Sequence, residues 1–146
     1  ENAFRLARPD PHFVEPAIVE VSVDGATFYR FPYDFVPHYD ENGELNLFNP
    51  FNYVRGFAGV HPVYSSKLIP DPTNPQLAGG DPFDLSDIPG VELTWISYIR
   101  ITATGDGWLT DADGDLVRHS NSAPFFAASG KGNSGFDLDA VSAVHY

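Results

Sequence analysis

The chain has 146 residues, 20 of them acidic and 8 basic, which gives a net charge of -12 at pH 7. One domain of this length can bury a hydrophobic core, whereas so negative a surface repels phosphate backbones and argues against nucleic acid as a partner. The absence of cysteine excludes thiolate catalysis and cysteine-ligated metal sites. No apolar run approaches the ~20 residues that a membrane-spanning helix needs.

Thirteen prolines, thirteen glycines and an aromatic share of 14% favour a loop-rich, all-β fold with little helix. We expect a single domain over residues 1–146, because no linker, repeat or low-complexity segment divides the chain. The chain begins at Glu1 and contains no methionine, which predicts a processed protein or a fragment of a longer one.

The first predicted strand covers residues 17–23, where three valines alternate with polar residues. Alternation with period 2 indicates a strand with one buried face. Asp24 and Gly25 follow, and this pair favours a two-residue type I′ hairpin turn, because both turn positions need positive φ. The return strand is predicted over residues 27–31, which are rich in β-forming residues.

Residues 32–68 form a long aromatic region. A structureless loop of that length is uncommon inside a compact domain, so we expect short strands and turns there. The segment Glu41–Asn42–Gly43 predicts a tight turn. The aromatic side chains expected to pack this region are Phe48, Phe51, Tyr53 and Phe57.

Residues 79–88 predict a turn and one short helical turn, with Asp84 as its cap and Asp87 as its acidic third residue. Together with Asp81 these carboxylates form an acidic group that capping and turn formation explain without a metal.

A second strong strand region covers residues 91–103, in which Ile99 and Ile101 share one face. Residues 116–118 predict a short strand. Residues 136–144 predict a buried strand at the end of the sheet.

An acidic run covers residues 104–116, and no lysine or arginine lies inside it. Carboxylates this close repel one another unless a positive charge lies among them. Calcium takes about 6–8 oxygen ligands, so the run predicts a calcium site; the alternative is a solvated acidic turn that binds nothing tightly. The run lacks the glycine and glutamate of an EF-hand at Leu116 and Ser122. The predicted ligands are Asp106, Asp111, Asp113 and Asp115.

Three stretches occur in the order of a known fold: VEVSVDGATFYRFP at 19–32, AGGDPFDLSDI at 78–88 with YIRIT at 98–102, and GFDLDAVSAV at 135–144. They resemble the galactose-binding-like, discoidin-type jelly roll, an antiparallel β-sandwich whose last strand closes the sheet beside the first. They are more closely similar to a group of uncharacterised secreted bacterial cell-surface proteins. The resemblance covers most of the chain and is specific for fold rather than for function.

In that group a hydrophobic strand precedes the ENAF segment, which here is residues 1–4. The resemblance therefore implies that this chain lacks a leading N-terminal strand: either that strand was cleaved, or the first sheet has an unpaired edge. An open edge is a template for pairing with another chain, so we expect a neighbouring copy to fill it and the protein to polymerise.

The resemblance also implies a structural calcium ion held between the first and last strands, with Glu1 and Asp139 as the pair of carboxylates. The alternative is that Asp137 and Asp139 face solvent at alternate positions of a strand. This ion and the ion predicted at the acidic run either share one site or occupy two separate sites.

Catalytic motifs are absent from the sequence, and the five histidines are scattered. A glycoside hydrolase is an alternative, because the distance between its two catalytic carboxylates is set by the fold and cannot be read from the sequence. Sugar binding is a further alternative, because an exposed aromatic ring can stack on the face of a sugar. The rings predicted for such contacts are Trp108, Tyr39 and Tyr64.

These features predict a non-enzymatic, extracellular module of the cell surface that calcium stabilises. Its expected role is structural or adhesive, with other copies of itself as partners in an oligomer or filament. The alternative is a carbohydrate-binding module whose partners are surface or matrix glycans.

Overall fold

The computed structural model describes residues 4–5, 12–64, 71, 73–105, 108–122, 135–138 and 140–145. Strands predominate over helices among these residues, and every paired strand runs antiparallel to its neighbour, as expected for an all-β fold. The short helices are α1 (Pro75–Ala78) and the 3-10 turns η1 (Pro50–Asn52), η2 (Leu85–Asp87) and η3 (Ser120–Ser122). No helix in the described part of the chain is long and apolar enough to cross a membrane.

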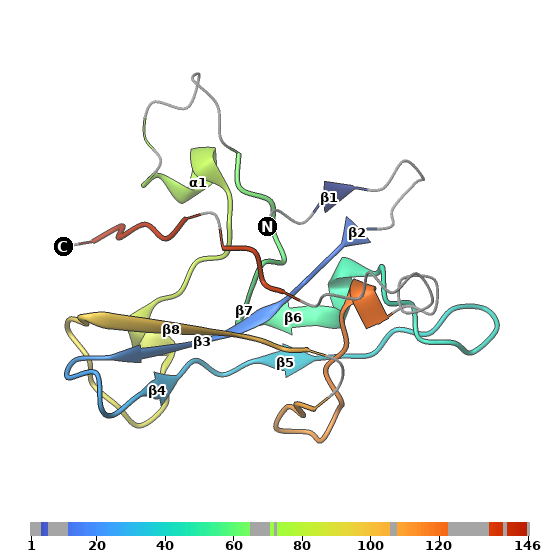
Figure 1. Ribbon diagram of the computed structural model, residues 1–146, viewed down its shortest axis with the longest axis horizontal. Helices are drawn as coiled ribbons and strands as arrows, with labels where there is room; N and C mark the ends of the chain where they lie inside the picture. Colours follow the sequence, from blue (N-terminus) through green and yellow to red (C-terminus); the bar gives the residue numbers. More distant parts are fainter. Residues whose placement is uncertain are drawn as a thin grey trace.

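Strand β3 (Ala17–Ser22) is the centre of the four-stranded sheet (Figure 1). Along one side it pairs with β4 (Tyr29–Arg30) and β7 (Phe57–Ala58), and along the other with all six residues of β8 (Tyr98–Ala103). Two further sheets have two strands each: β1 (Phe4–Arg5) with β2 (His12–Phe13), and β5 (Asp34–Phe35) with β6 (Tyr53–Arg55).

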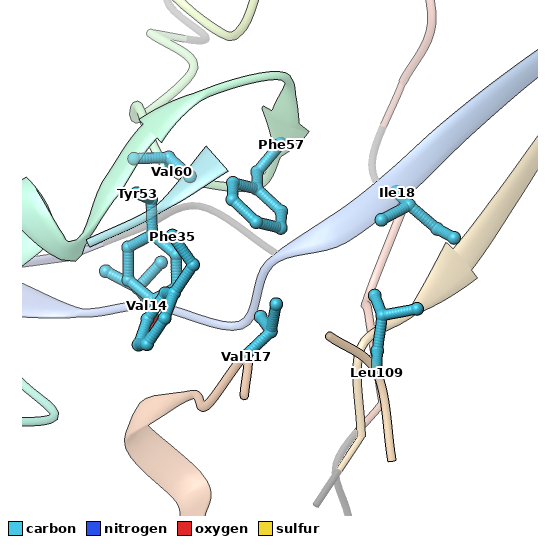
Figure 2. Close-up of a cluster of buried hydrophobic side chains, with 8 residues drawn as sticks. All are labelled: Val14, Ile18, Phe35, Tyr53, Phe57, Val60, Leu109 and Val117. Carbon is cyan, nitrogen blue, oxygen red and sulfur yellow. The ribbon is translucent and has the colours of Figure 1, made fainter. Parts of the chain in front are cut away.

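Both faces of β3 are buried, since Glu20 and Ser22 are buried together with the valines, so the prediction of a strand with a single buried face is wrong. Ile18 contributes to a first core cluster, and Val19 and Val21 contribute to a second on the opposite face. The first core cluster consists of Val14, Ile18, Phe35, Tyr53, Phe57, Val60, Leu109 and Val117 (Figure 2). The buried residues of the second are Val19, Val21, Phe31 and Ile88.

The predicted hairpin forms, but its turn is longer than two residues. The register pairs Val21 with Tyr29, and β4 is confined to Tyr29–Arg30. The loop instead closes around Asp24, whose Oδ1 accepts the amides of Ala26 and Thr27, each at 2.8 Å. A side chain that satisfies the loop amides stabilises a wide loop as well as a tight turn.

Local turn chemistry confirms three other predictions. The segment from Glu41 to Gly43 is a turn, closed by the amide of Gly43 on the carbonyl of Asp40 at 3.0 Å. Asp84 caps η2 through the amide of Ser86 at 2.9 Å. The region 32–68 contains short strands, as expected, with Tyr53 and Phe57 buried; Phe51, however, is 74% exposed, so its predicted packing role is wrong.

Two strand predictions need correction. Of residues 91–103 only Tyr98–Ala103 form a strand, although Ile99 and Ile101 share a face as predicted. The described residues between 136 and 144 form no strand, and most of them are exposed. The reason is that no strand in the described part of the chain pairs with them.

Candidate functional site

Residues 110–116 of the acidic run form a hairpin in which Asp111 accepts backbone amides. Thr110 bridges Leu116, and the amide of Asp111 donates to the carbonyl of Asp115 at 3.1 Å. Asp111 Oδ1 accepts the amides of Asp113 and Asp115 at 3.0 and 2.9 Å. The predicted strand at residues 116–118 is reduced to the isolated bridge at Leu116.

This acidic hairpin is attached to the core by side chains as well as by packing. Asp111 Oδ2 accepts the amide of Phe35 at 3.0 Å. The hydroxyl of Tyr33 donates to the carbonyl of Thr110 at 2.9 Å, and the hydroxyl of Tyr53 donates to that of Arg118 at 2.6 Å. Burial raises the pKa of Tyr53, which keeps its hydroxyl a donor at all physiological pH values.

Asp111 therefore has a structural role that requires no metal. Its carboxylate accepts three backbone amides, two within the hairpin and one from β5. Among the described residues, no group of three or more histidine, aspartate or glutamate side chains is placed to hold a metal ion. Asp113 is exposed and Asp115 is half-buried, while the predicted ligand Asp106 lies outside the described residues.

The second predicted calcium pair lies outside the described residues, since neither Glu1 nor Asp139 is among them. Asp137 is described and exposed, as the alternative reading expects. The calcium expectation at both places stays a prediction.

In the acidic group at residues 81–87, Asp84 caps a helical turn as predicted, whereas Asp81 bonds a distant segment of the chain. Asp81 Oδ2 accepts the amide of Val60 at 2.9 Å, and its Oδ1 lies 2.7 Å from Nδ1 of His61. Amide and hydroxyl hydrogen bonds from Ser86 lower the pKa of Asp84 below its usual value. The carboxylates of Asp81 and Asp84 thus fix loops.

The three rings predicted for sugar contact are all exposed, but they come from different parts of the fold. Tyr39 belongs to the loop after β5, which extends to the right in Figure 1. Tyr64 is held beside α1, at the upper left, by its amide on the carbonyl of Ala78 at 2.7 Å. Trp108 lies against Gly105 near the end of β8. No contact between described residues joins the three rings into one platform.

A cleft that sequence reasoning missed has a volume of about 170 Å³. Two phenylalanines line it in an edge-to-face pair, with their ring centroids 5.0 Å apart. One guanidinium and one carboxylate complete the walls. It is smaller than the roughly 300–1,000 Å³ of pockets that enclose drug-sized ligands, so it fits only one unit of a larger ligand. The lining residues are Phe31, Pro32, Arg55, Gly56, Pro82, Phe83 and Asp87.

No sequence pattern could have located this cleft, because its walls come from three separated segments. Gly56 is essential to its shape: φ is 75°, and a Cβ there would lie 1.9 Å from the carbonyl oxygen of Pro32. An L-residue is strained in this conformation, and the carbonyl leaves no space for one.

The outer edge of β8 is the most exposed apolar feature of the main sheet. Trp95, Tyr98 and Ile99 are large apolar residues with exposed side chains on or just before this strand. No strand in the described part of the chain pairs with that edge. Edge strands of natural proteins are normally protected by charge, proline or a covering segment.

One face of this edge carries a small basic patch in an otherwise acidic protein. Glu20 lies between two arginines: Arg30 donates to Oε1 at 3.0 Å and Arg100 to Oε2 at 3.3 Å. Arg100 also stacks on the ring of Phe28, with its Cζ 3.5 Å from the ring centroid. The two guanidiniums carry one more charge than Glu20 neutralises, so the patch favours an anionic neighbour.

A scan against protein-family models finds no match to this chain, and searches of curated proteins and of solved structures find no similar protein.

Proposed function

We propose that this protein is a non-catalytic, extracellular structural or adhesive module of a cell surface that associates with copies of itself. The observation that carries the proposal is the edge of β8, where exposed apolar side chains accompany a strand with no partner on its outer side among the described residues. Such an edge favours the addition of another strand, because backbone hydrogen bonds and apolar contacts form together.

The proposal includes the jelly-roll sandwich expected from the resemblance. Its support is the burial of both faces of β3, by Ile18 in the first core cluster and by Val19 and Val21 in the second. A sheet covered on both faces and open at one edge is the arrangement that strand addition extends.

Self-association is tested by sedimentation velocity over a range of protein concentrations, with electron microscopy for filaments. We expect concentration-dependent oligomers in the unmodified protein. Ile99→Lys should abolish them, since a charged side chain on an edge strand opposes pairing. The matched control is Val54→Lys, which changes an exposed valine of β6 and should leave association intact. A protein that stays monomeric at every concentration contradicts the proposal.

Calcium is the proposed stabiliser, on the basis of the acidic run. If calcium binds the native state alone, the free energy of unfolding rises by about 2.7 kcal/mol at 100 times the dissociation constant. Thermal melting with calcium and with EGTA measures this, and magnesium serves as the control. An unchanged melting temperature would contradict calcium binding. It would not affect the proposal that the protein associates through the edge of β8.

A second candidate function, sugar binding, is favoured by the cleft that Arg55 and Asp87 flank and by the exposed rings. Sugar hydroxyls both donate and accept hydrogen bonds, while the C–H face of a sugar packs on aromatic rings. A glycan array probed with the unmodified protein, Trp108→Ala and Arg55→Ala distinguishes sugar binding at the Trp108 ring from sugar binding in the cleft. Signal that only Arg55→Ala removes assigns the cleft, and the absence of any signal excludes this candidate.

A further inference from the structure

The cleft beside Gly56 contains two opposite charges that no described side chain neutralises. Arg55 and Asp87 line it from separate segments of the chain. Neither makes an ion pair with the other or with any further side chain in the described part of the chain, although Asp34 lies opposite Arg55 where β5 pairs with β6. The guanidinium and the carboxylate are therefore both available to a ligand.

The other side chains that line the cleft are apolar. The ring of Phe31, which is 3% exposed, packs edge-to-face on the half-buried ring of Phe83. Pro32 and Pro82 extend this apolar surface. An apolar group that covers these rings is removed from water and gains contact with them, so hydrophobic burial favours its binding.

The backbone around the cleft is held in place by hydrogen bonds of the fold itself. The amide of Phe31 donates to the carbonyl of Val19 in β3 at 3.1 Å. Arg55 ends β6, and Asp87 ends η2, where its amide donates to the carbonyl of Asp84 at 2.9 Å. A ligand whose partners are already positioned loses less free energy in ordering them.

The size and the charges of the cleft together define a class of ligand. A volume of about 170 Å³ suits a molecule of the size of one residue rather than a chain of several. A neutral sugar leaves both charges without a counterion. An α-amino acid carries an ammonium group, a carboxylate and a side chain on one carbon atom, so it offers a partner to each of the three features.

We propose that this cleft binds a free α-amino acid with an apolar side chain. The ligand's carboxylate accepts hydrogen bonds from the guanidinium of Arg55, a pairing whose two planar groups match in a bidentate geometry. Its ammonium group donates to the carboxylate of Asp87. Its side chain packs against Phe31 and Phe83. This ligand is a different one from the sugar of the second candidate function, and its binding does not depend on association through β8.

Titration of the isotope-labelled protein with L-leucine, followed by nuclear magnetic resonance, tests the proposal. We expect the amides of Gly56 and Phe83 to shift, while the amide of Gly43, in a separate loop, does not. Leucinamide lacks the carboxylate and N-acetyl-leucine lacks the ammonium group. Each should bind about three- to tenfold more weakly than leucine, since hydrogen bonds to charged groups are strong but both protein charges are partly in water.

Two variants assign each charge to its partner. Arg55→Gln should weaken the binding of leucine about three- to tenfold and leave the binding of leucinamide unchanged. Asp87→Asn should do the same to leucine and leave N-acetyl-leucine unchanged. Damage to the fold would instead weaken every ligand equally. Arg118→Gln is the matched control, because Arg118 does not line the cleft, and it should change no affinity.

Equal affinities for leucine, leucinamide and N-acetyl-leucine would overturn the proposal, because the two charges would then contribute nothing. Tighter binding of N-acetyl-leucine than of leucine would replace the free amino acid by the C-terminal residue of a peptide. Shifts with glucose and none with leucine would assign the cleft to a sugar. The absence of shifts with every ligand would also overturn the proposal, and none of these results bears on self-association.

Discussion

Phe35→Ala is expected to lower the free energy of unfolding by about 3–5 kcal/mol, the cost of deleting a buried phenylalanine. Phe35 is 1% exposed in the first core cluster, with its ring centroid 5.5 Å from that of Tyr53. Its loss leaves a cavity where β5, β6 and the acidic hairpin meet (Figure 2). Since single domains are stable by only about 5–15 kcal/mol, this loss removes a large fraction of the free energy of unfolding.

The control is Phe51→Ala, which makes the same chemical change at a side chain that is 74% exposed. Its expected effect is within about 0.5 kcal/mol, as for most surface substitutions. Urea denaturation followed by fluorescence measures both variants. Equal effects at the two positions would show that the first core cluster is wrongly assigned.

Asp111→Asn is expected to lower the free energy of unfolding by about 1.5–3 kcal/mol, the value of hydrogen bonds to a charged group. The carboxylate accepts three amides with its two oxygens. Asparagine retains one oxygen and turns an N–H₂ donor toward an amide donor, either at Phe35 or within the hairpin. The hairpin should then detach from β5 before the rest of the domain unfolds.

Asp113→Asn is the matched control, because Asp113 is exposed and lies in the same hairpin. In EGTA its effect should be small. If it destabilises the protein strongly in calcium alone, its carboxylate binds the ion. Chemical denaturation of both variants, with calcium and with EGTA, separates the role of Asp111 as an acceptor from the role of the run as a calcium site. Equal loss for both variants in EGTA contradicts the role assigned to Asp111.

Features that depend on a few neighbouring residues were predictable from sequence. The strand at β3, the shared face of Ile99 and Ile101 in β8, the turn at Gly43 and the cap at Asp84 all follow from local side-chain chemistry. The exposure of Tyr39, Tyr64 and Trp108 was also predictable, because aromatic residues in turn-rich segments have few neighbours to pack against.

Features that depend on distant segments were not predictable. Asp111 binds the amide of Phe35, 76 residues away, and nothing near either residue in the sequence indicates this contact. The cleft at Gly56 needs three segments at once. The residues from 136 to 144 have a strand pattern, but a strand also needs a neighbour, and pattern alone does not supply one.

Resemblance of short stretches is a guide to local structure more than to topology. The stretch at 19–32 forms an antiparallel pair and that at 98–102 lies in β8. The described residues of the stretch at 135–144 pair with no strand in the part of the chain that the structure describes.

Hydrogen exchange of the β8 amides, followed by mass spectrometry at increasing protein concentration, tests self-association through this edge most directly. Exchange reports the opening of individual backbone hydrogen bonds. The account predicts that amides of Tyr98–Ala103 become protected as oligomers form, while the loop around Gly43 does not change. Oligomers that form with unaltered exchange in β8 would contradict it.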